Sequence, residues 1–386
     1  MSSNKPSRSL NRREFLGRVS GAALASGAGL ALVHKGVDAL SAETKLERRN
    51  EQSGMIYKPF GKTNLNVSRL SYGCIQLTDD RLPAMETAIE RGVNLVHIAR
   101  GYTGGQAIVA LGKFLKTPSN RDKVWVALKG EQGRGLPSNI DDQLKILNTD
   151  HVDIICSPIF GPDQIRKSEQ DVKKFEAFQK AGKARFLNLT THENVQQGME
   201  AGLEAGWFTS ILATIDLGIV APLQPTIQKA NQQNVGIMAM KTERNKKAGG
   251  PDKIAATLLP AGVTTILRSL TTGPQVDTWF NAVTKAPQAM VALAVDHQAA
   301  AGDCTLCGLC EGCPNGVAIQ SIVRDYTYYY EQQGLAEIAA ERYAELHPKQ
   351  TVVSCKDCGR CELICPMEVP VRRIIREAHA RLSATA

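Results

Sequence analysis

The chain has 386 residues, 43% of them hydrophobic, so it can bury one large core and a smaller one. Its formal net charge is +8, but no basic stripe interleaved with aromatic residues occurs, which argues against a nucleic-acid partner. No stretch of about twenty apolar residues follows the N-terminal segment, which argues against a membrane-spanning body.

Residues 1–41 have the composition of an export signal. The twin arginine Arg12-Arg13 is followed by Phe15-Leu16 and by a weakly hydrophobic run, 19–33, made mostly of Gly, Ala, Ser and Leu. This order is typical of a Tat signal, whose route carries folded proteins with their cofactors; the alternative is a basic tail without a targeting role. We therefore expect a periplasmic protein, which an uncleaved signal would anchor to the inner membrane.

Between residues 55 and 285, short apolar runs rich in β-branched residues alternate with longer amphipathic stretches. The predicted strands are residues 67–74, 94–99, 124–129, 152–157, 184–190, 210–216, 235–241 and 263–269. The predicted helices are residues 83–91, 105–115, 140–147, 170–180, 193–204, 223–233, 252–259 and 275–285. Eight strand–helix pairs predict an α/β fold of the (β/α)8 TIM-barrel type. The runner-up is an open doubly wound sheet, but no G-x-G-x-x-G motif opens the first helix.

Eight of the ten cysteines lie in two runs within residues 286–386. The first run contains Cys304, Cys307, Cys310 and Cys313. The second contains Cys355, Cys358, Cys361 and Cys365, and it has the C-x2-C-x2-C-x3-C-P spacing of bacterial ferredoxins, whose last cysteine ligates the other cluster. We expect two 4Fe-4S clusters in a ferredoxin-like, α-helical C-terminal domain. Zinc, disulfides or a single cluster are the alternatives.

Two helices are predicted in this C-terminal region, at residues 334–346 and 371–382. A run of aromatic residues, 326–330, lies between the two cysteine motifs. The sequence leaves two roles open for this run: shielding a cluster, or packing as a helix against the barrel.

Several segments resemble the aldo-keto reductases. Residues 57–73 resemble the opening of that family, and residues 92–102 follow its G-x-N-x-x-D-T-A-x-x-Y pattern with a histidine at the aspartate position. Residues 182–186 and 236–241 match later strands, and the cysteine tail is similar to one branch with a ferredoxin-like extension. The resemblance implies hydride transfer from NADPH to a carbonyl, with a tyrosine as general acid beside a lysine, an aspartate and a histidine.

The resemblance assigns the tyrosine to Tyr102 and the lysine to Lys129, at the carboxyl ends of predicted strands. His97 stands at the aspartate position, and Pro158 stands at the histidine position. The lysine therefore lacks its carboxylate, which predicts easier deprotonation of Lys129, and the proline offers no side-chain donor to a substrate.

The resemblance also places two cofactor contacts. Thr190 stands where the family holds the nicotinamide amide, next to His192, for which a packed loop histidine is the alternative to a ligand or proton donor. Arg268, followed by Ser269, is what is left of the basic motif that grips the NADPH phosphate. We therefore expect NADP(H) to bind poorly.

Together these features predict an exported iron–sulfur oxidoreductase whose clusters pass electrons between a redox partner protein and a small-molecule substrate at the barrel mouth. One alternative is plain NADPH-dependent carbonyl reduction, with the clusters as accessories. The other is a barrel that serves only as an electron-transfer scaffold.

Overall fold

The computed structural model describes residues 46–130, 135–159, 168–243, 249–287, 302–304, 306, 308–365 and 367–384. Leu46–Ala386 form one compact unit. The predicted export signal, residues 1–41, lies outside the described residues. Among those described, no helix is long and apolar enough to cross a membrane.

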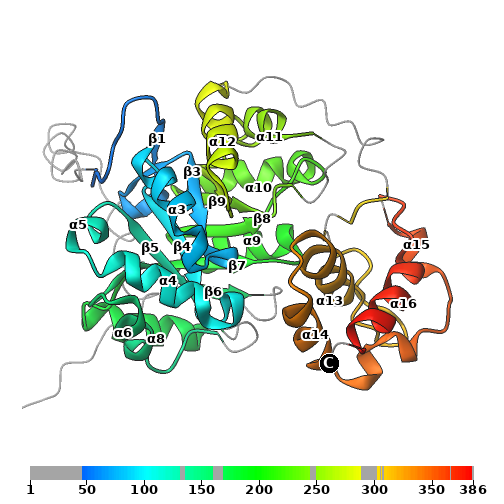
Figure 1. The fold of residues 1–386 in the computed structure, drawn as a ribbon. Helices are drawn as coiled ribbons and strands as arrows, with labels where there is room; N and C mark the ends of the chain where they lie inside the picture. The colour runs from blue at the N-terminus through cyan, green and yellow to red at the C-terminus, as the bar shows by residue number, and fades with distance from the viewer. Residues whose placement is uncertain are drawn as a thin grey trace, which may run out of the picture. The chain divides into compact units, whose positions relative to one another are not determined.

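Eight parallel strands close into a barrel in the order β10-β3-β4-β5-β6-β7-β8-β9 (Figure 1). Their bounds are β3 Leu70–Gly73, β4 Leu95–Ala99, β5 Trp125–Lys129, β6 Val152–Ile159, β7 Ala184–Thr191, β8 Ser210–Thr214, β9 Gly236–Met240 and β10 Thr265–Arg268. Most of these strands are buried along their whole length, because side chains alternate between the barrel interior and the helix layer. The predicted TIM barrel is confirmed.

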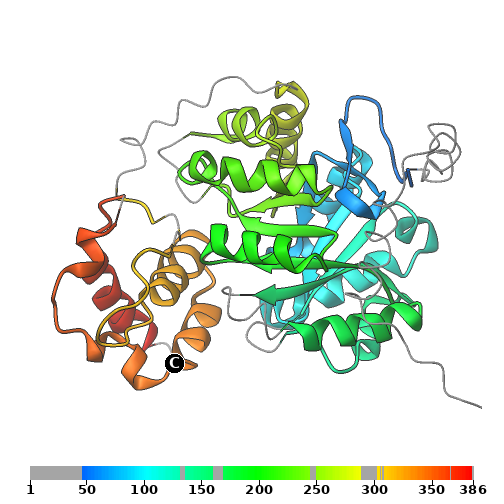
Figure 2. The same cartoon turned by 180° about the vertical axis from the view of Figure 1, so that it is seen from behind.

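Helices follow the strands and cover the outside of the barrel (Figures 1 and 2). Their bounds are α3 Leu82–Glu90, α4 Gln106–Leu115, α5 Pro118–Arg121, α6 Asp141–Leu147, α8 Glu169–Lys180, α9 Val195–Ala205, α10 Val220–Gln232, α11 Pro251–Leu258 and α12 Gly273–Lys285. In α4, Ala107, Ile108, Leu111 and Leu115 are buried, the spacing that gives a helix one apolar face.

The segment predicted as one strand, residues 67–74, is two strands. β2 (Asn66–Ser68) pairs antiparallel with β1 (Tyr57–Pro59), and β3 enters the barrel beyond Arg69. The buried Arg69 side chain donates to the carbonyls of Val263 and Thr264, at 2.8 and 3.1 Å. This tertiary contact, which the apolar pattern does not encode, accounts for the break.

The remaining elements before the C-terminal region are short. They are the 3-10 turns η1 Gly61–Thr63, η2 Cys74–Gln76, η3 Asp79–Arg81 and η4 Tyr102–Gly105. At the floor of the barrel, Phe60 is fully buried against Gly236. A Cβ on Gly236 would lie 2.5 Å from the Phe60 ring, so glycine is required for this close packing.

The C-terminal region is helical, as predicted. Its elements are α13 Ile319–Val323, η5 Arg324–Gln332, α14 Ala336–Ala344, η6 Pro348–Gln350, η7 Val352–Ser354, α15 Arg360–Leu363 and α16 Val371–Leu382. These elements share a hydrophobic core of their own, which includes Ile322, Tyr329 and Ile375, with several cysteines packed against it. The predicted helix at residues 371–382 is confirmed at both ends. The tyrosine run lies in a π-helix, a rare conformation that often occurs at functional sites.

Candidate active site

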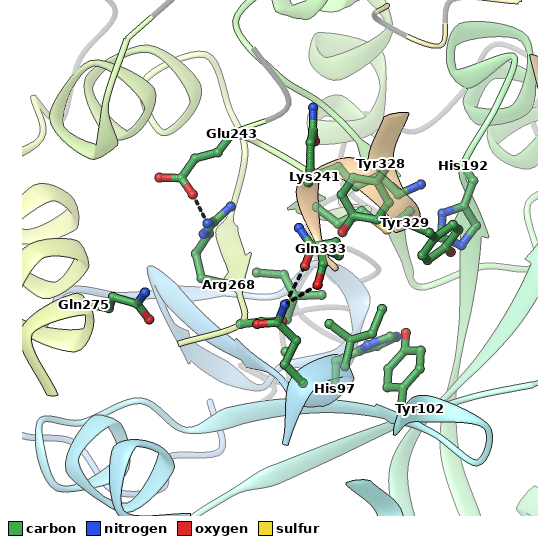
Figure 3. A pocket seen from close by; sticks show the side chains of 17 residues that line it. His97, Tyr102, His192, Lys241, Glu243, Arg268, Gln275, Tyr328, Tyr329 and Gln333 are labelled. Atoms are coloured by element: carbon green, nitrogen blue, oxygen red, sulfur yellow. Dashed lines mark hydrogen bonds and ion pairs between the residues drawn. The ribbon is translucent and has the colours of Figure 1, made fainter. Parts of the chain in front are cut away.

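A cavity of about 330 Å³ opens at the carboxyl ends of the barrel strands (Figure 3). Active sites of TIM-barrel enzymes lie at this end. Barrel residues and residues from η5 line it together. They are Gly73, Ile75, Gln76, His97, Tyr102, His192, Met240, Lys241, Glu243, Leu267, Arg268, Ser269, Gln275, Tyr328, Tyr329, Gln332 and Gln333.

Tyr102, Lys129 and His97 come together in the structure, as the sequence predicts. The Lys129 ammonium lies 5.2 Å from the centre of the Tyr102 ring, and the ring centroids of His97 and Tyr102 are 6.0 Å apart. β4 carries His97, the turn after β4 carries Tyr102, and β5 ends at Lys129. Two neighbouring strands therefore deliver all three side chains to one place.

Burial sets the protonation of these groups. It raises the pKa of Tyr102 well above its usual value, with the neighbouring Tyr329 and Tyr328 adding to the effect. Burial, together with Arg342, lowers the pKa of Lys129 to about 8. Among the described residues, the charges that act on Lys129 come from Arg342, Arg324 and Cys156.

His97 is a neutral histidine. Burial, and then the charge of Lys129, lower its pKa to about 3. Its side chain is 2% exposed, and its Nε2 has no hydrogen-bond partner among the described residues. A buried polar atom usually has a partner, so the unpaired Nε2 of this cavity-lining residue is an exception for which the described residues supply no explanation. Pro158, in β6, supplies no such group.

The opposite side of the cavity carries charge. Arg268, the last residue of β10, forms an ion pair with Glu243, and burial lowers its pKa. The Lys241 ammonium lies 4.3 Å from the centre of the Tyr328 ring. Gln275 accepts a hydrogen bond from the Thr271 amide at 2.8 Å. The role of Arg268 as a cofactor contact stays a prediction, and its pairing with Glu243 has no signal in the sequence.

Thr190 does not line this cavity. It is fully buried in β7, and its hydroxyl donates to the Asn188 side chain at 3.3 Å. His192, two residues later, does line the cavity, and burial together with Lys241 lowers its pKa well below 6.5. The role of Thr190 as a cofactor contact stays a prediction.

The C-terminal region supplies one wall of the cavity. Tyr328 and Tyr329 in η5 face it, and Gln333 accepts two hydrogen bonds from the Gln76 amide, at 3.3 and 3.2 Å (Figure 3). The tyrosine run thus packs against the barrel, one of the two roles left open by the sequence. Neither the strand and helix periods of the barrel nor the spacing of the cysteines predicts that the tyrosine run lines the cavity at the barrel mouth.

Buried ion pairs hold this wall in place. Arg324, the first residue of η5, pairs with Glu193 beyond the end of β7, and both side chains are almost completely buried. Asp325 accepts from Arg324 at 2.8 Å and from Arg342 in α14 at 2.9 Å. Burial alone would raise the pKa of Asp325, but the two guanidinium groups lower it. Each charge in this set therefore has an opposite charge beside it.

The described cysteines of the two motifs line two cavities in the C-terminal region. Cys304, Cys310 and Cys365 line the first cavity, and the second is lined by Cys310, Cys313, Cys355, Cys358 and Cys361. The last cysteine of each motif therefore lies with the other motif. This exchange is the arrangement of two-cluster ferredoxins. Cys307 lies outside the described residues.

The backbone of the two motifs is also equivalent. The residues two and four positions after the first cysteine have positive φ in both motifs: Leu306 (53°) and Gly308 (87°), and Asp357 (55°) and Gly359 (74°). The amides of Leu306 and Asp357 donate to the sulfurs of Cys304 and Cys355, each at 3.4 Å. This grouping of thiols fits two 4Fe-4S clusters.

Within the described residues, no group of three or more His, Cys, Asp or Glu side chains is placed to hold a metal ion. The thiolates of one cluster each bind a different iron, so they stand farther apart than the ligands of a single ion. The two cysteine cavities are therefore compatible with this finding.

The barrel is similar to proteins of one known family. The profile of the aldo/keto reductase family matches residues 69–243, just under half of the chain, and the match does not include the cysteine motifs. Aldo-keto reductase YhdN of Bacillus subtilis (strain 168) is 23% identical over 158 residues, which are 35% of this chain and 47% of YhdN. The chain thus spans about half the length of this curated relative.

Two solved structures share the fold. The putative aldo-keto reductase PA4992 of Pseudomonas aeruginosa has a TM-score of 0.50 and 19% identity, covering 62% of this chain and 98% of that chain. The holo form of AKR11C1 from Bacillus halodurans has a TM-score of 0.50 and 20% identity, covering 61% and 93%. These two likenesses show the fold of the barrel.

Proposed function

Because this chain carries a domain of the aldo/keto reductase family, we propose that it is an oxidoreductase that reduces a small carbonyl compound at the barrel mouth, with electrons supplied through two 4Fe-4S clusters. One observation carries the proposal: the segment between the two cysteine motifs forms a wall of the mouth cavity. A ligand in that cavity contacts both the barrel and the C-terminal region.

Tyr102 is the proposed proton donor. Its raised pKa keeps the hydroxyl protonated, and the nearby Lys129 ammonium favours the phenolate that forms when the proton leaves. Among the described residues no carboxylate acts on Lys129, so no nearby negative charge offsets its attraction for the phenolate.

His97 takes the place of the missing substrate-orienting histidine. It comes from β4 rather than from the position of Pro158, it lines the same cavity as Tyr102, and its Nε2 is unpaired among the described residues. With a pKa of about 3, the ring is neutral at every working pH, so it can hydrogen-bond a substrate oxygen or hydroxyl without adding charge.

The clusters would be held by cysteines grouped across the two motifs. Cys304, Cys307, Cys310 and Cys365 would hold the first, and Cys313, Cys355, Cys358 and Cys361 the second. Bound there, the clusters supply one-electron transfer. In these sets, Cys313, Cys355, Cys358, Cys361 and Cys365 form no disulfide.

NADPH-dependent carbonyl reduction is the second candidate, and the family match favours it. Lys241 and Arg268 would be the cationic contacts for the cofactor phosphates. The pairing of Arg268 with Glu243, and a cavity of about 330 Å³ at the low end for ligand sites, favour a small substrate without the dinucleotide.

A donor comparison separates the two candidates. Methylglyoxal reduction would be followed with either dithionite-reduced methyl viologen or NADPH as the sole donor. We expect turnover with the viologen and its loss in Tyr102→Phe, with cluster reduction unchanged. Turnover with NADPH alone, with a cofactor Kd below about 10 μM, would restore the second candidate. If Tyr102→Phe behaved as wild type, the barrel would be a scaffold.

We also propose export to the periplasm. The support is the sequence order of residues 11–33 and the need to load clusters before export. Replacing Arg12 and Arg13 together by lysine should leave loaded protein in the cytoplasm, because a receptor reads the arginine pair. Unchanged periplasmic accumulation of this variant would exclude a Tat signal.

A further inference from the structure

The two cysteine cavities lie in different surroundings. We propose that the site lined by Cys304, Cys310 and Cys365 is the inner site, which exchanges electrons with a ligand in the barrel mouth. The site of Cys313, Cys355, Cys358 and Cys361 is the outer site, which exchanges electrons with an external one-electron carrier. This division rests on the proposed function and assigns each motif its own role.

A barrel residue contacts the loop of the first motif. A Cβ on Gly308 would lie 1.7 Å from Oδ1 and 2.8 Å from Cγ of Asn194, so the loop backbone packs directly on this side chain. Asn194 precedes α9 and follows His192 and Glu193, which lie at the mouth. Its amide also donates to Glu311, in the same motif, at 3.4 Å. The first motif therefore adjoins the carboxyl end of β7.

A single stretch of chain connects the inner site to the mouth wall. Gln320 and Val323 of α13 line the inner cavity, and the Gln320 amide donates to the Leu306 carbonyl at 2.6 Å. η5 begins at the residue after Val323 and carries Tyr328 and Tyr329 to the mouth. One side of the inner cavity and the wall of the barrel mouth are thus formed by consecutive helices, α13 and η5.

The second motif has a different environment. At Gly359, the equivalent of Gly308, a Cβ would meet only Arg372 of the same region, at 3.8 Å. Cys358 is exposed, whereas the three described cysteines of the inner cavity are only partly exposed. The adjoining Leu363 and Val353 are 88% and 71% exposed, compared with 52% for Leu309 beside the inner cavity. Exposed apolar side chains beside a redox site suit a transient protein contact. The outer site therefore faces solvent.

The electron balance needs one named co-reactant. Reduction of a carbonyl to an alcohol takes two electrons and two protons. The carrier gives up one electron in each of two encounters, and each electron passes from the outer to the inner site. Tyr102 supplies one proton and water the other.

A spin label at the mouth tests the order of the sites. Gly101 has no atom within 4 Å of its Cβ position, so a nitroxide-bearing amino acid can be incorporated there, which avoids thiol labelling of the cysteines left free when a variant loses a cluster. Relaxation of the nitroxide by reduced clusters would be measured with Cys355→Ala or Cys304→Ala added. We expect Cys355→Ala to keep most of the enhancement and Cys304→Ala to lose most of it. Equal or reversed effects would overturn the assignment.

A matched glycine pair decides the case if either cysteine variant loses both clusters. Asparagine tolerates positive φ, so Gly308→Asn and Gly359→Asn have similar backbone strain, but only the first collides with Asn194. We expect Gly308→Asn to weaken the enhancement and Gly359→Asn to leave it unchanged. The same effect from both would refute the inference. A lack of iron in the wild type would instead refute the proposed function.

Discussion

Buried charged side chains have different surroundings at the amino ends of the barrel strands, the floor, and at their carboxyl ends, the mouth. At the floor, Asp153 in β6 is fully buried and forms ion pairs with Arg121 and Arg185, at 3.0 and 3.1 Å, with Arg49 at 3.9 Å. It also accepts from the Val126 amide at 2.9 Å. The buried carboxylate therefore has compensating charges and hydrogen bonds on several sides.

At the mouth, Lys129 is equally buried but has no carboxylate acting on it, and His97 has an unpaired Nε2 among the described residues. Such groups lower stability unless a ligand uses them. In TIM barrels the residues at the floor generally contribute to stability and those at the mouth to the reaction, and the difference between Asp153 and Lys129 follows this division.

Removing the floor carboxylate should have the largest effect on stability. Asp153→Asn leaves three guanidinium groups without their shared partner, so we expect a loss of about 3–5 kcal/mol in the free energy of unfolding in urea. Asp141→Asn breaks only an exposed pair with Lys183 and should cost about 1 kcal/mol or less. Equal losses from the two variants would contradict the claim that the buried ion pairs of Asp153 contribute more to stability than an exposed pair.

Neutralising the mouth lysine should have the opposite pattern. Lys129→Met removes a buried charge without an acidic partner, so the free energy of unfolding should change by less than about 1 kcal/mol or increase. Viologen-linked turnover should fall about 100- to 1000-fold, because the phenolate loses its positive neighbour. Lys113→Met, at an exposed position, serves as the control. A stability loss above about 2 kcal/mol would mean that Lys129 is structural.

The neutral histidine predicts a pH dependence of stability. The folded pKa of His97, about 3, lies below the unfolded value of about 6.5, so the unfolded chain binds the proton first as pH falls. Stability contributed by neutral His97 is therefore lost from pH 6.5 downward, by about 2 kcal/mol at pH 5. His97→Asn should lose less stability than the wild type over this range. Parallel pH curves would contradict a buried neutral ring.

The charge of Lys129 predicts the smallest effect, a shift in a pH profile. With a pKa of about 8, the ammonium loses its proton above that pH, so turnover should decline from pH 8 upward. In Lys129→Arg the charge persists, and the decline should move upward by at least about one pH unit. If the pH profile of turnover in Lys129→Arg were the same as in the wild type, the decline above pH 8 would belong to another titrating group.

The barrel could be predicted because its information is local. The apolar periods predicted the strands that end just before Tyr102 and at Lys129, whereas the roles of these two residues come from the resemblance to the aldo-keto reductases and stay predictions. The rest depends on tertiary contacts that no period encodes: the break at Arg69, the pairing of Arg268 with Glu243, and the burial of Thr190 away from the cavity. The wall of Tyr328 and Tyr329 also comes from a region far away in sequence.

The central claim, that redox clusters serve the barrel mouth, is tested most directly by metal analysis of anaerobically purified protein. The grouping of the cysteines across the two motifs predicts about eight iron and about eight acid-labile sulfide per chain, with broad absorption near about 400 nm. Four iron would mean that only one site is loaded. Stoichiometric zinc without sulfide would contradict the account and leave a plain reductase or a scaffold.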